Sequence, residues 1–475
     1  MSMHILVEHV LQTAKENSLW NPHDTIIVAV SGGPDSVALL HVMHEISYKH
    51  TPLNLICAHI HHGLRIESDD EAVMVQRMAE GLGIPFVMEA IDVPAYMKES
   101  GKGVEEAARV KRYEFLMRTA TEYGSRSIAL AHHADDQAET VLLHLLRGSG
   151  PSGLVGMKLK RTIKNMELIR PLLRIYKTDL MEVCETENFQ YVIDQSNLET
   201  KHRRNAIRLD ILPYLGQYNG QITQSLNQLS NVMTAEDEYV ELAAEEKFLE
   251  LVQRSDGRFT FGVPSFLGLH VALQRRLIKL ILNYMSVDSE IIDYNKVESL
   301  REAITSSLTT TWSRDLGGGY VCIREYDVVT LQPKSKSHMQ RLSYTYQVST
   351  AVSEHMVSEI GKVLKVSIES RTEMSWSKME VGQYEAMFDA DQIVFPLTVR
   401  CRQDGDTIKV MGLNGSKKVK NIFIDDKIPP SLRTQIPMIL DGNNVIIWIP
   451  GIRRSIHAPI HQQTTSVLHL SLEDT

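Results

Sequence analysis

The stretch Asp24-Thr25-Ile26-Ile27-Val28-Ala29-Val30-Ser31-Gly32-Gly33-Pro34-Asp35-Ser36 decides the fold of the first half of the chain. Its β-branched part, residues 24–30, predicts a buried parallel strand that ends at two glycines. Pro34, Asp35 and Ser36 then open an apolar helical stretch. We therefore expect a sharp turn between a strand and a helix at this point of the chain.

The same alternation continues to about residue 146. Apolar runs predict strands at 53–60, 85–88 and 127–131, and helical patterns lie at about 69–82, 104–123 and 135–146. Strands that alternate with helices imply a parallel sheet with both faces covered. We expect an α/β domain in residues 1–218.

The texture changes after about residue 219. Residues 219–335 are predicted to form a mainly helical domain, with a strand-like pattern from Thr309 to Leu331. A linker is expected at 334–345. The remainder, residues 345–475, has short β-rich runs divided by proline and glycine, which predicts a small α+β domain.

Composition limits the class of protein. A chain of 475 residues with 43% apolar and 23% charged residues is expected to form two or three globular domains. It shows neither an apolar run long enough to span a membrane nor a secretory signal. Its four cysteines are far apart and form no CxxC pair, which disfavours disulfide scaffolds and zinc ribbons. We expect a cytoplasmic protein.

The turn at residues 31–36 has the features of an anion site. Two glycines let the backbone approach a ligand, and the helix that follows offers free N–H groups at the positive end of its dipole. Ser31 and Ser36 can add hydroxyl donors. Asp35 would repel a phosphate unless Mg²⁺ or an ammonium group lies nearby. A simple strand–helix turn with a helix cap is the alternative.

The loop reads SGGxDS, and it is neither a Walker A motif nor the dinucleotide GxGxxG. It resembles the signature of the PP-loop ATP pyrophosphatases. The resemblance implies a Rossmann-like parallel-sheet PP-loop domain at the N-terminus, with the ATP phosphates bound by residues Ser31, Gly32, Gly33, Pro34, Asp35 and Ser36. Members of that family split ATP between the α and β phosphates.

Two helical segments carry further candidates. Asp136 and Glu139 are three residues apart and face the same way, so beside an ATP site they can hold Mg²⁺ or a substrate ammonium. Helix-dipole charges are the alternative, and a zinc site of His132, His133 and Asp136 is a weaker one. Arg109 and Arg112 share a helix face and suit the charge of a leaving pyrophosphate, or simply a solvated basic face.

Several segments together resemble the tRNA(Ile)-lysidine synthase family. They are residues 105–113, 132–157, 169–173, 194–197, 203–208, 400–406, 417–420 and 448–453. The resemblance implies ATP-dependent adenylation of the cytidine at the first anticodon position of tRNA(Ile) with a CAU anticodon. Free L-lysine then displaces AMP at C2 to give lysidine.

The resemblance also implies roles for single residues. Asp35, Arg112, Asp136 and Glu139 are the catalytic candidates, and the three carboxylates among them would orient the lysine and accept its proton. His59, Arg109 and His132 join the loop as ATP-binding candidates. Mg²⁺ would be held through the ATP phosphates, with Asp35 or Asp136 as a protein ligand.

The basic residues are unevenly distributed in a chain whose net charge is −9. They gather in three clusters, which we expect to bind tRNA phosphates. The candidates are Arg170, Arg174, Arg203, Arg204, Arg208, Arg400, Arg402, Lys417, Lys418 and Lys420. The family resemblance implies that the domains 219–335 and 345–475 bind tRNA, although each basic cluster alone is more often a solvated face.

Two other functions stay open at this point. One is another PP-loop tRNA-modifying enzyme of the thiolation type. Thiolation members commonly use a cysteine or a CxxC-held cluster to handle sulfur, and this chain has no CxxC pair. The other is a non-catalytic tRNA-binding protein with a degenerate loop. A homodimer is open as well.

Overall fold

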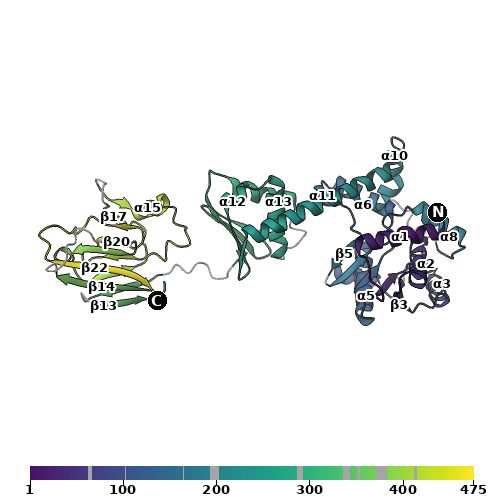
Figure 1. The fold of residues 1–475 in the computed structure, drawn as a ribbon, viewed down its shortest axis with the longest axis horizontal. Helices are drawn as coiled ribbons and strands as arrows, with labels where there is room; N and C mark the ends of the chain where they lie inside the picture. The colour runs from purple at the N-terminus through teal and green to yellow at the C-terminus, as the bar shows by residue number, and fades with distance from the viewer. Residues whose placement is uncertain are drawn as a thin grey trace. The chain divides into compact units, whose positions relative to one another are not determined.

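The computed structural model describes residues 1–61, 67–91, 93–101, 103–163, 165–192, 203–285, 293–334, 343–349, 353–370, 382–410 and 415–475. The chain divides into two compact units, Met1–Leu242 and Ala243–Thr475, and each is considered by itself. Figure 1 shows both units and labels some of their helices and strands.

The first unit confirms the predicted alternation of strands and helices. Its elements are α1 (Met3–Asn17), β1 (Thr25–Ala29), α2 (Pro34–Lys49), β2 (Asn54–His61), α3 (Glu67–Gly81), β3 (Phe86–Ala90), α4 (Val93–Ser100), α5 (Val104–Glu122), β4 (Ser127–Ala129), α6 (Ala134–Leu146), α7 (Pro151–Leu154), β5 (Lys160–Ile163), β6 (Met166–Ile169), α8 (Lys177–Thr186), α9 (Arg203–Ala206), the π-helix η2 (Ile207–Ile211), α10 (Leu212–Gly216) and most of α11 (Ile222–Leu251). The four predicted strands correspond to β1–β4.

One six-stranded sheet forms the centre of this unit, in the order β3-β2-β1-β4-β6-β5. The strands β3, β2, β1, β4 and β6 run parallel, and only β5 is antiparallel to its neighbour. The β5–β6 hairpin adds two strands that the sequence had not indicated. The order reverses between β1 and β4, so the loops that follow these two strands face the crevice where ligands bind in open α/β sheets.

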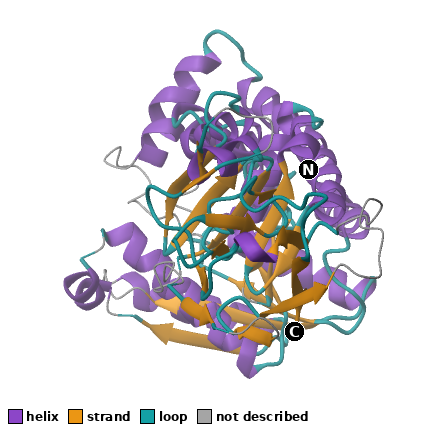
Figure 2. Cartoon of the chain, turned by 90° about the vertical axis from the view of Figure 1, so that its left-hand side faces the viewer, coloured by secondary structure: helices purple, strands orange, loops and turns teal. Residues whose placement is uncertain are grey.

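Alternation along β1 assigns the helices to the two faces of the sheet. Ile26 and Val28 pack in one cluster with buried residues of α1, α2 and α8, whereas Ile27 packs in another with residues of α5. Burial on both faces explains why the strand is apolar throughout. Figure 2 shows the chain coloured by helix, strand and loop.

The first part of the second unit contains both helices and strands, whereas the sequence predicted a mainly helical domain there. It contains β7 (Gln253–Ser255), β8 (Arg258–Gly262), α12 (Val263–Leu267), α13 (Val271–Tyr284), α14 (Tyr294–Thr305), β9 (Thr311–Gly317), β10 (Tyr320–Glu325) and β11 (Val328–Pro333). The helices pack over a sheet of order β7-β8-β11-β10-β9 through a shared apolar cluster. Strands at 311–333 agree with the strand-like pattern predicted there.

The C-terminal part is α+β, as predicted. Its elements are β12 (Thr345–Val348), β13 (Ser353–Val357), β14 (Lys362–Ser370), β15 (Glu385–Asp389), the 3-10 helix η6 (Ala390–Gln392), β16 (Leu397–Arg400), β17 (Thr407–Ile408), β18 (Lys417–Lys418), α15 (Val419–Asp425), β19 (Met438–Leu440), β20 (Ile446–Ile449), β21 (Arg453–Arg454) and β22 (Ser466–Asp474). A five-stranded and a four-stranded sheet share one apolar core. The helix α11 continues without a break through residue 242, where the two compact units meet in the sequence. The predicted domain boundaries, at residue 218 and at residues 335–345, therefore stay predictions.

Candidate functional site

The conformation of the loop between β1 and α2 is stabilised by hydrogen bonds within the loop. Gly32 has a left-handed φ of +91°, which L-residues rarely adopt. The Ser36 hydroxyl donates to the Gly33 carbonyl at 2.9 Å and accepts from the Ser31 N–H at 3.1 Å. Pro34 occupies the first turn of α2, and no side chain caps this helix end. The turn therefore presents the start of α2 to any ligand bound above it.

A cavity of about 560 Å³ opens above this loop. We call it the loop cavity; among its walls are residues 29–31 and 33–36, the ends of β2 and β4, and Arg112. It is large enough for a nucleotide-sized molecule. Ser31, Gly33, Pro34, Asp35, Ser36, His59, Arg112 and His132 line it, so the fold brings together most of the predicted ATP-binding residues.

His133, which the sequence suggested only as a weak zinc ligand, lies at the centre of an acidic cluster beside the loop. Its Nε2 is 3.6 Å from Asp35 Oδ2 and 3.4 Å from Asp136 Oδ2, and its Nδ1 is 3.4 Å from Asp135 Oδ2. Burial alone would lower the pKa of His133, but the three carboxylates outweigh burial and raise it. The cluster thus favours the protonated, cationic form of the histidine.

The carboxylates of α6 are neutralised by arginines from α9 and η2. Arg204 donates to Asp136 Oδ1 at 2.9 Å and to Glu139 Oε2 at 2.8 Å. Arg208 donates to Glu139 at 2.5 and 3.1 Å and to Asp136 at 3.2 Å. These contacts confirm that the two carboxylates share a helix face. They also show that Arg204 and Arg208, predicted to contact tRNA, are engaged with Asp136 and Glu139 here.

Asp35 differs from Asp136 in its free bonding capacity. Its Oδ1 is buried and has no hydrogen-bond partner among the described residues, whereas its Oδ2 lies 3.7 Å from Lys177 Nζ. Asp136, by contrast, accepts bonds at Oδ1 from both arginines and at Oδ2 from the His133 N–H. Of the two carboxylates, Asp35 is the one that retains an unoccupied oxygen.

The two predicted arginines of α5 line different cavities. Arg112 lines the loop cavity, and its buried Nε has no partner within the described part of the chain. Burial lowers the pKa of Arg112, although a guanidinium stays protonated in proteins. Arg109 does not line the loop cavity; it lines the second one, described next. Both guanidinium carbons lie within 5.6 Å of the centre of the Tyr113 ring.

The second cavity, of about 1080 Å³, is lined by many cations, and we call it the basic cavity. Its described lining includes no carboxylate, and its cations are Arg109, Arg147, Lys158, Lys160, Arg161, Arg170, Arg203 and Arg204. His132 lines both this cavity and the loop cavity. Burial lowers the pKa of His132 to about 3, so it faces both spaces as a neutral ring. A polyanion in the basic cavity would therefore lie next to a ligand in the loop cavity.

Two further predicted residues, His59 and Arg170, are buried in the walls of these cavities. His59 is buried, and its Nδ1 lies 2.8 Å from the Val30 carbonyl, which joins the ends of β1 and β2. Burial lowers the pKa of His59. Arg170 is buried and donates to the Lys158 carbonyl at 2.7 Å. Both line a cavity, so a bound ligand can reach them.

Comparison with known proteins agrees with this geometry. Residues 3–215 match the PP-loop domain family, and residues 397–470 match the TilS substrate C-terminal domain. A Bacillus cereus protein named tRNA(Ile)-lysidine synthase is 32% identical over 464 residues, which cover 95% of this chain and 93% of the relative. The chain belongs to the tRNA(Ile)-lysidine synthase family.

Other members of the lysidine synthase family are similarly related. The Bacillus subtilis protein of that name is 33% identical over 442 residues, covering 91% of this chain and 90% of that protein. A Listeria monocytogenes protein named bifunctional protein TilS/HprT is 33% identical over 445 residues, covering 93% of this chain and 67% of that protein. Membership makes this chain a ligase with an ATP-using PP-loop domain. No described helix is long and apolar enough to cross a membrane.

The predicted tRNA contacts of the C-terminal region fall within the segment that matches the lysidine synthase C-terminal domain. Arg400 is largely buried and pairs with Asp406 through two hydrogen bonds of 2.9 and 2.7 Å, which is a structural role. Arg402 pairs with Asp404 at 2.7 Å, and Lys417 pairs with Asp425 at 2.6 Å. Lys418 and Lys420 are exposed. Arg174 in the first unit is partly exposed and lies 3.5 Å from Glu16.

Some predicted segments lie outside the described residues. They are residues 194–197, which contributed to the family resemblance, and the part of the expected linker from 335 to 342. Among the residues beside the loop that the sequence did not assign to it are His133, Asp135 and Lys177. Asp135 accepts from the Lys177 N–H at 2.8 Å and so ties the start of α6 to the start of α8. The adjacent pair Asp135-Asp136 after two histidines was the available signal for the cluster around His133.

Proposed function

We propose that this chain joins free L-lysine to C2 of the cytidine at the first anticodon position of tRNA(Ile) with a CAU anticodon, and that it adenylates the base with ATP beforehand. The family and the printed names of the relatives support this reaction. The observation that carries it is the shared wall at His132. A loop suited to phosphates lies on one side of this residue, and a cavity lined by cations lies on the other.

ATP would bind in the loop cavity. Backbone N–H groups at the start of α2 and the Ser31 and Ser36 hydroxyls are suited to the phosphates. Arg112 brings a buried cation with an unused N–H to the same cavity. Its charge would stabilise the pyrophosphate as the bond between the α and β phosphates breaks.

Mg²⁺ would be held by Asp35 together with the ATP phosphates. Mg²⁺ usually binds through one or two carboxylates plus substrate phosphates, and it would neutralise phosphate charge during transfer. Asp35 Oδ1 fits this role because it is buried and lacks a partner among the described residues. Asp136 fits it less well, because both of its oxygens already accept hydrogen bonds.

Lysine must be oriented and must lose a proton from its ammonium group before the ε-amine can attack C2. Asp35, Asp136 and Glu139 are the predicted carboxylates that can bind it. A lysine ammonium at Asp136 or Glu139 has to exchange with Arg204 or Arg208, which now hold those oxygens. We therefore place the first contact of the ammonium at Asp35, and a carboxylate of the α6 pair would accept the proton after its arginine has moved away.

tRNA would enter the basic cavity with its anticodon loop. The cations there can neutralise RNA phosphates; Arg170, Arg203 and Arg204 are the predicted tRNA contacts among them, whereas Arg109 was predicted for ATP. The target base would then reach His132 at the boundary with the loop cavity. The predicted roles of 219–335 and 345–475 in tRNA binding, and a homodimer, remain part of this proposal.

A thiolation reaction is the weaker alternative. The described cysteines line neither cavity, and Cys57, Cys184 and Cys322 are buried. Burial raises the pKa of the Cys57 thiol to about 12 and that of Cys184 to about 11, so neither is a ready thiolate.

The test is direct. The chain is incubated with ATP, radiolabelled lysine and unmodified tRNA(Ile), and label in the tRNA is measured together with AMP and pyrophosphate. We expect one AMP and one pyrophosphate for each lysine incorporated. Omission of lysine should leave adenylated tRNA and pyrophosphate. Incorporation of sulfur from a sulfur donor, or no pyrophosphate at all, would remove the proposal.

A further inference from the structure

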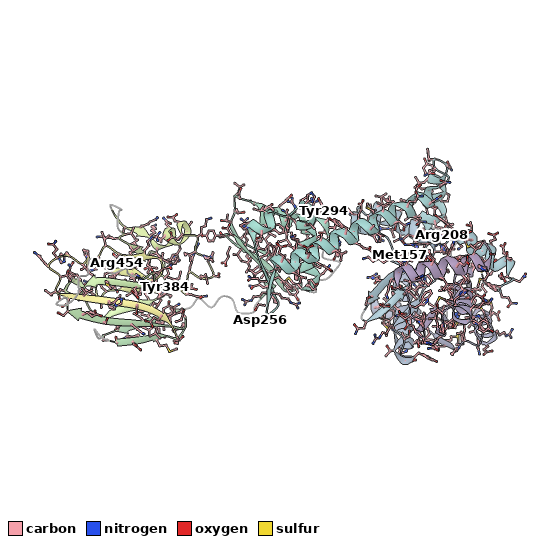
Figure 3. The ribbon with its side chains drawn as sticks, viewed as in Figure 1. Met157, Arg208, Asp256, Tyr294, Tyr384 and Arg454 are labelled. Carbon is pink, nitrogen blue, oxygen red and sulfur yellow. The ribbon has the colours of Figure 1, made fainter. Side chains whose placement is uncertain are left out.

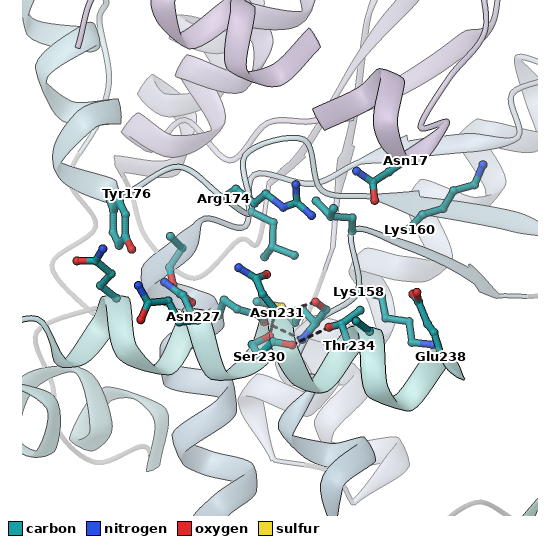
Figure 4. Close-up of a pocket in the computed structure, with 18 residues that line it drawn as sticks. Asn17, Lys158, Lys160, Arg174, Tyr176, Asn227, Ser230, Asn231, Thr234 and Glu238 are labelled. Atoms are coloured by element: carbon teal, nitrogen blue, oxygen red, sulfur yellow. Dashed lines mark hydrogen bonds between the residues drawn. The ribbon is translucent and has the colours of Figure 1, made fainter. Parts of the chain in front are cut away.

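A third cavity, of about 620 Å³, lies in the first unit between α11 and the loops at the start of α6 and α8. Six of the residues that line it carry side-chain amides, and we call it the amide cavity. They are Asn17, Gln137, Gln224, Asn227, Gln228 and Asn231. Figure 4 shows Asn227 and Asn231 on α11 along one side, with Tyr176, Arg174 and Lys160 on the opposite side.

The polarity of α11 in this region is unusual for a helix that packs on a domain. A helix normally turns an apolar stripe toward its neighbour. Here Leu226 and Ser230 make the close packing, and the residues beside them on the same face are amides. The side chains of Gln224, Gln228 and Asn231 make no hydrogen bond or ion pair with the described residues, so their amide donors and acceptors are available to a ligand in the cavity.

The amide cavity adjoins the basic cavity. Met157, Lys158 and Lys160 line both, so this short stretch forms the wall between them. Two of these three residues are cations, and Arg174 adds a third on the amide side. A polyanionic strand that fills the basic cavity can thus continue across the wall with its phosphates against lysines.

We propose that the amide cavity binds a second, unpaired nucleobase of the RNA substrate, next in space to the base that reacts at His132. The proposal rests on the function proposed above. Asn and Gln side chains offer a donor and an acceptor side by side, which matches the edges of bases. Tyr176 offers an aromatic surface, and single-stranded RNA bases bind proteins by stacking on such rings.

The chemistry disfavours a small anion or a free amino acid as the occupant. Only Glu238 among the lining residues is acidic, so an ammonium group would have a single carboxylate acceptor there. The amides outnumber the cations, which is the balance expected for a base with one flanking phosphate rather than for a free phosphate. A base in this cavity would let the enzyme examine a position other than the one it modifies.

The experiment uses a series of tRNA(Ile) molecules, each lacking one base of the anticodon loop other than the reactive cytidine. Dissociation constants are measured for the unaltered enzyme and for Gln228→Ala/Asn231→Ala. We expect one abasic position that weakens binding to the unaltered enzyme about tenfold. At that position alone, base removal should cost the double variant almost nothing further, because the base has already lost its partners.

Ala235→Trp provides a second variant, since this small residue lines the cavity and a large ring there would fill it. It should weaken binding of intact tRNA and leave the affinity for ATP unchanged. Gln221→Ala is the matched control, because it removes an exposed amide just before α11 that does not line the cavity. This control should behave like the unaltered enzyme with every tRNA.

The outcome that overturns the proposal is equally specific. If both cavity variants bind intact tRNA as well as the unaltered enzyme does, or if every abasic tRNA loses the same factor with all proteins, the cavity binds no base. Lysine incorporation by the unaltered enzyme is measured in parallel. Failure of that reaction alone would count against the proposed function, and the abasic pattern would still decide the fate of the amide cavity.

Discussion

The guanidinium of Arg208 donates from Nε to Glu139 Oε1 over 2.5 Å, and the side chain of Glu139 that accepts this bond is only 1% exposed. Arg204 binds the other oxygen of the same carboxylate. A carboxylate so deeply buried requires a cation, because an unpaired buried charge costs several kcal/mol. The ion pairs of Glu139 with Arg204 and Arg208 therefore fix α9 and η2 against α6, next to the loop cavity. Met157 and Arg208 are labelled in this unit in Figure 3.

Glu139→Gln should destabilise the first unit by about 2–3 kcal/mol, since the amide leaves two guanidiniums without their charge partner. The estimate is reduced because Arg204 and Arg208 are partly exposed. Urea unfolding measures the effect, and hydrogen exchange should show the opening in residues 203–216. Glu187→Gln, on an exposed turn after α8, should change stability by less than about 0.5 kcal/mol. Equal losses in the two variants would contradict the structural role of the arginines.

Gly32→Ala should weaken ATP binding about tenfold while the protein remains folded. A Cβ at this position would meet only side-chain atoms at 3.5 Å or more, so the cost comes from the φ of +91° and not from a clash. That cost is about 1–2 kcal/mol, which the loop can relieve by changing its conformation. Isothermal titration with ATP measures the loss. Gly81→Ala, which has an ordinary φ and nothing within 4 Å, is the matched control and should bind ATP normally.

Gln137→Leu should loosen the junction between α6, the 155–157 turn and α11. The Gln137 amide donates to the carbonyls of Val155 and Met157 and to the Ser230 hydroxyl, and it accepts from the Met157 N–H. Loss of these partners leaves buried polar groups unsatisfied and should cost about 2–3 kcal/mol. Thermal unfolding measures it. Gln224→Leu, which removes an amide with no such bonds, should have little effect, and a result as large as that of Gln137→Leu would refute the role of Gln137.

Periodicity made much of the fold accessible from sequence. The strands β1–β4 are short apolar runs bounded by turns, and both faces of β1 are buried, so its pattern is continuous and hard to misread. The spacing of Asp136 and Glu139 likewise predicted that they share a face, because i and i+3 are neighbours on any helix. Local rules sufficed wherever the deciding contacts were local.

Other features depended on signals that were weak or distant. The hairpin β7–β8 interrupts a predicted helical region, although Asp256-Gly257 at its turn, with φ of 49° and 73°, is a recognised hairpin dipeptide (Figure 3). The partners of Glu139 lie 65 and 69 residues further along the chain, and no periodicity reports such a contact. The helix spacing of Arg109 and Arg112 predicted that they act together. They lie almost one helical turn apart on α5, and this separation is enough for them to line different cavities.

The charged state of His133 should give the stability a defined pH dependence. Its pKa is raised above the ordinary 6.5 by the surrounding carboxylates, so its contribution is complete below about pH 6.5 and is lost as the pH rises through the raised value. The pKa values of Asp135 and Asp136 are lowered despite burial, so their contribution to stability persists above pH 3.8 and is lost only in stronger acid.

Unfolding free energies of the unaltered protein and of His133→Asn are compared from about pH 5.5 to 8.5. The difference should shrink as the pH rises, and it should depend less on pH in an Asp135→Asn background. A difference that grows with pH would invert the assignment.

Salt should reveal whether the basic cavity binds RNA phosphates. Each phosphate contact on single-stranded RNA contributes about −0.7 to the slope of log affinity against log salt. Arg161 lines this cavity, is exposed and makes no ion pair within the described residues. Arg161→Gln should therefore make the slope for tRNA(Ile) shallower by about 0.7 and weaken binding most at low salt. Arg126→Gln removes another exposed charge, just before β4 at the amino end of that strand and outside the cavity lining, and should leave the slope unchanged. Equal slopes for Arg161→Gln and the unaltered protein, measured from about 50 to 200 mM salt, would mean that the strand does not pass Arg161.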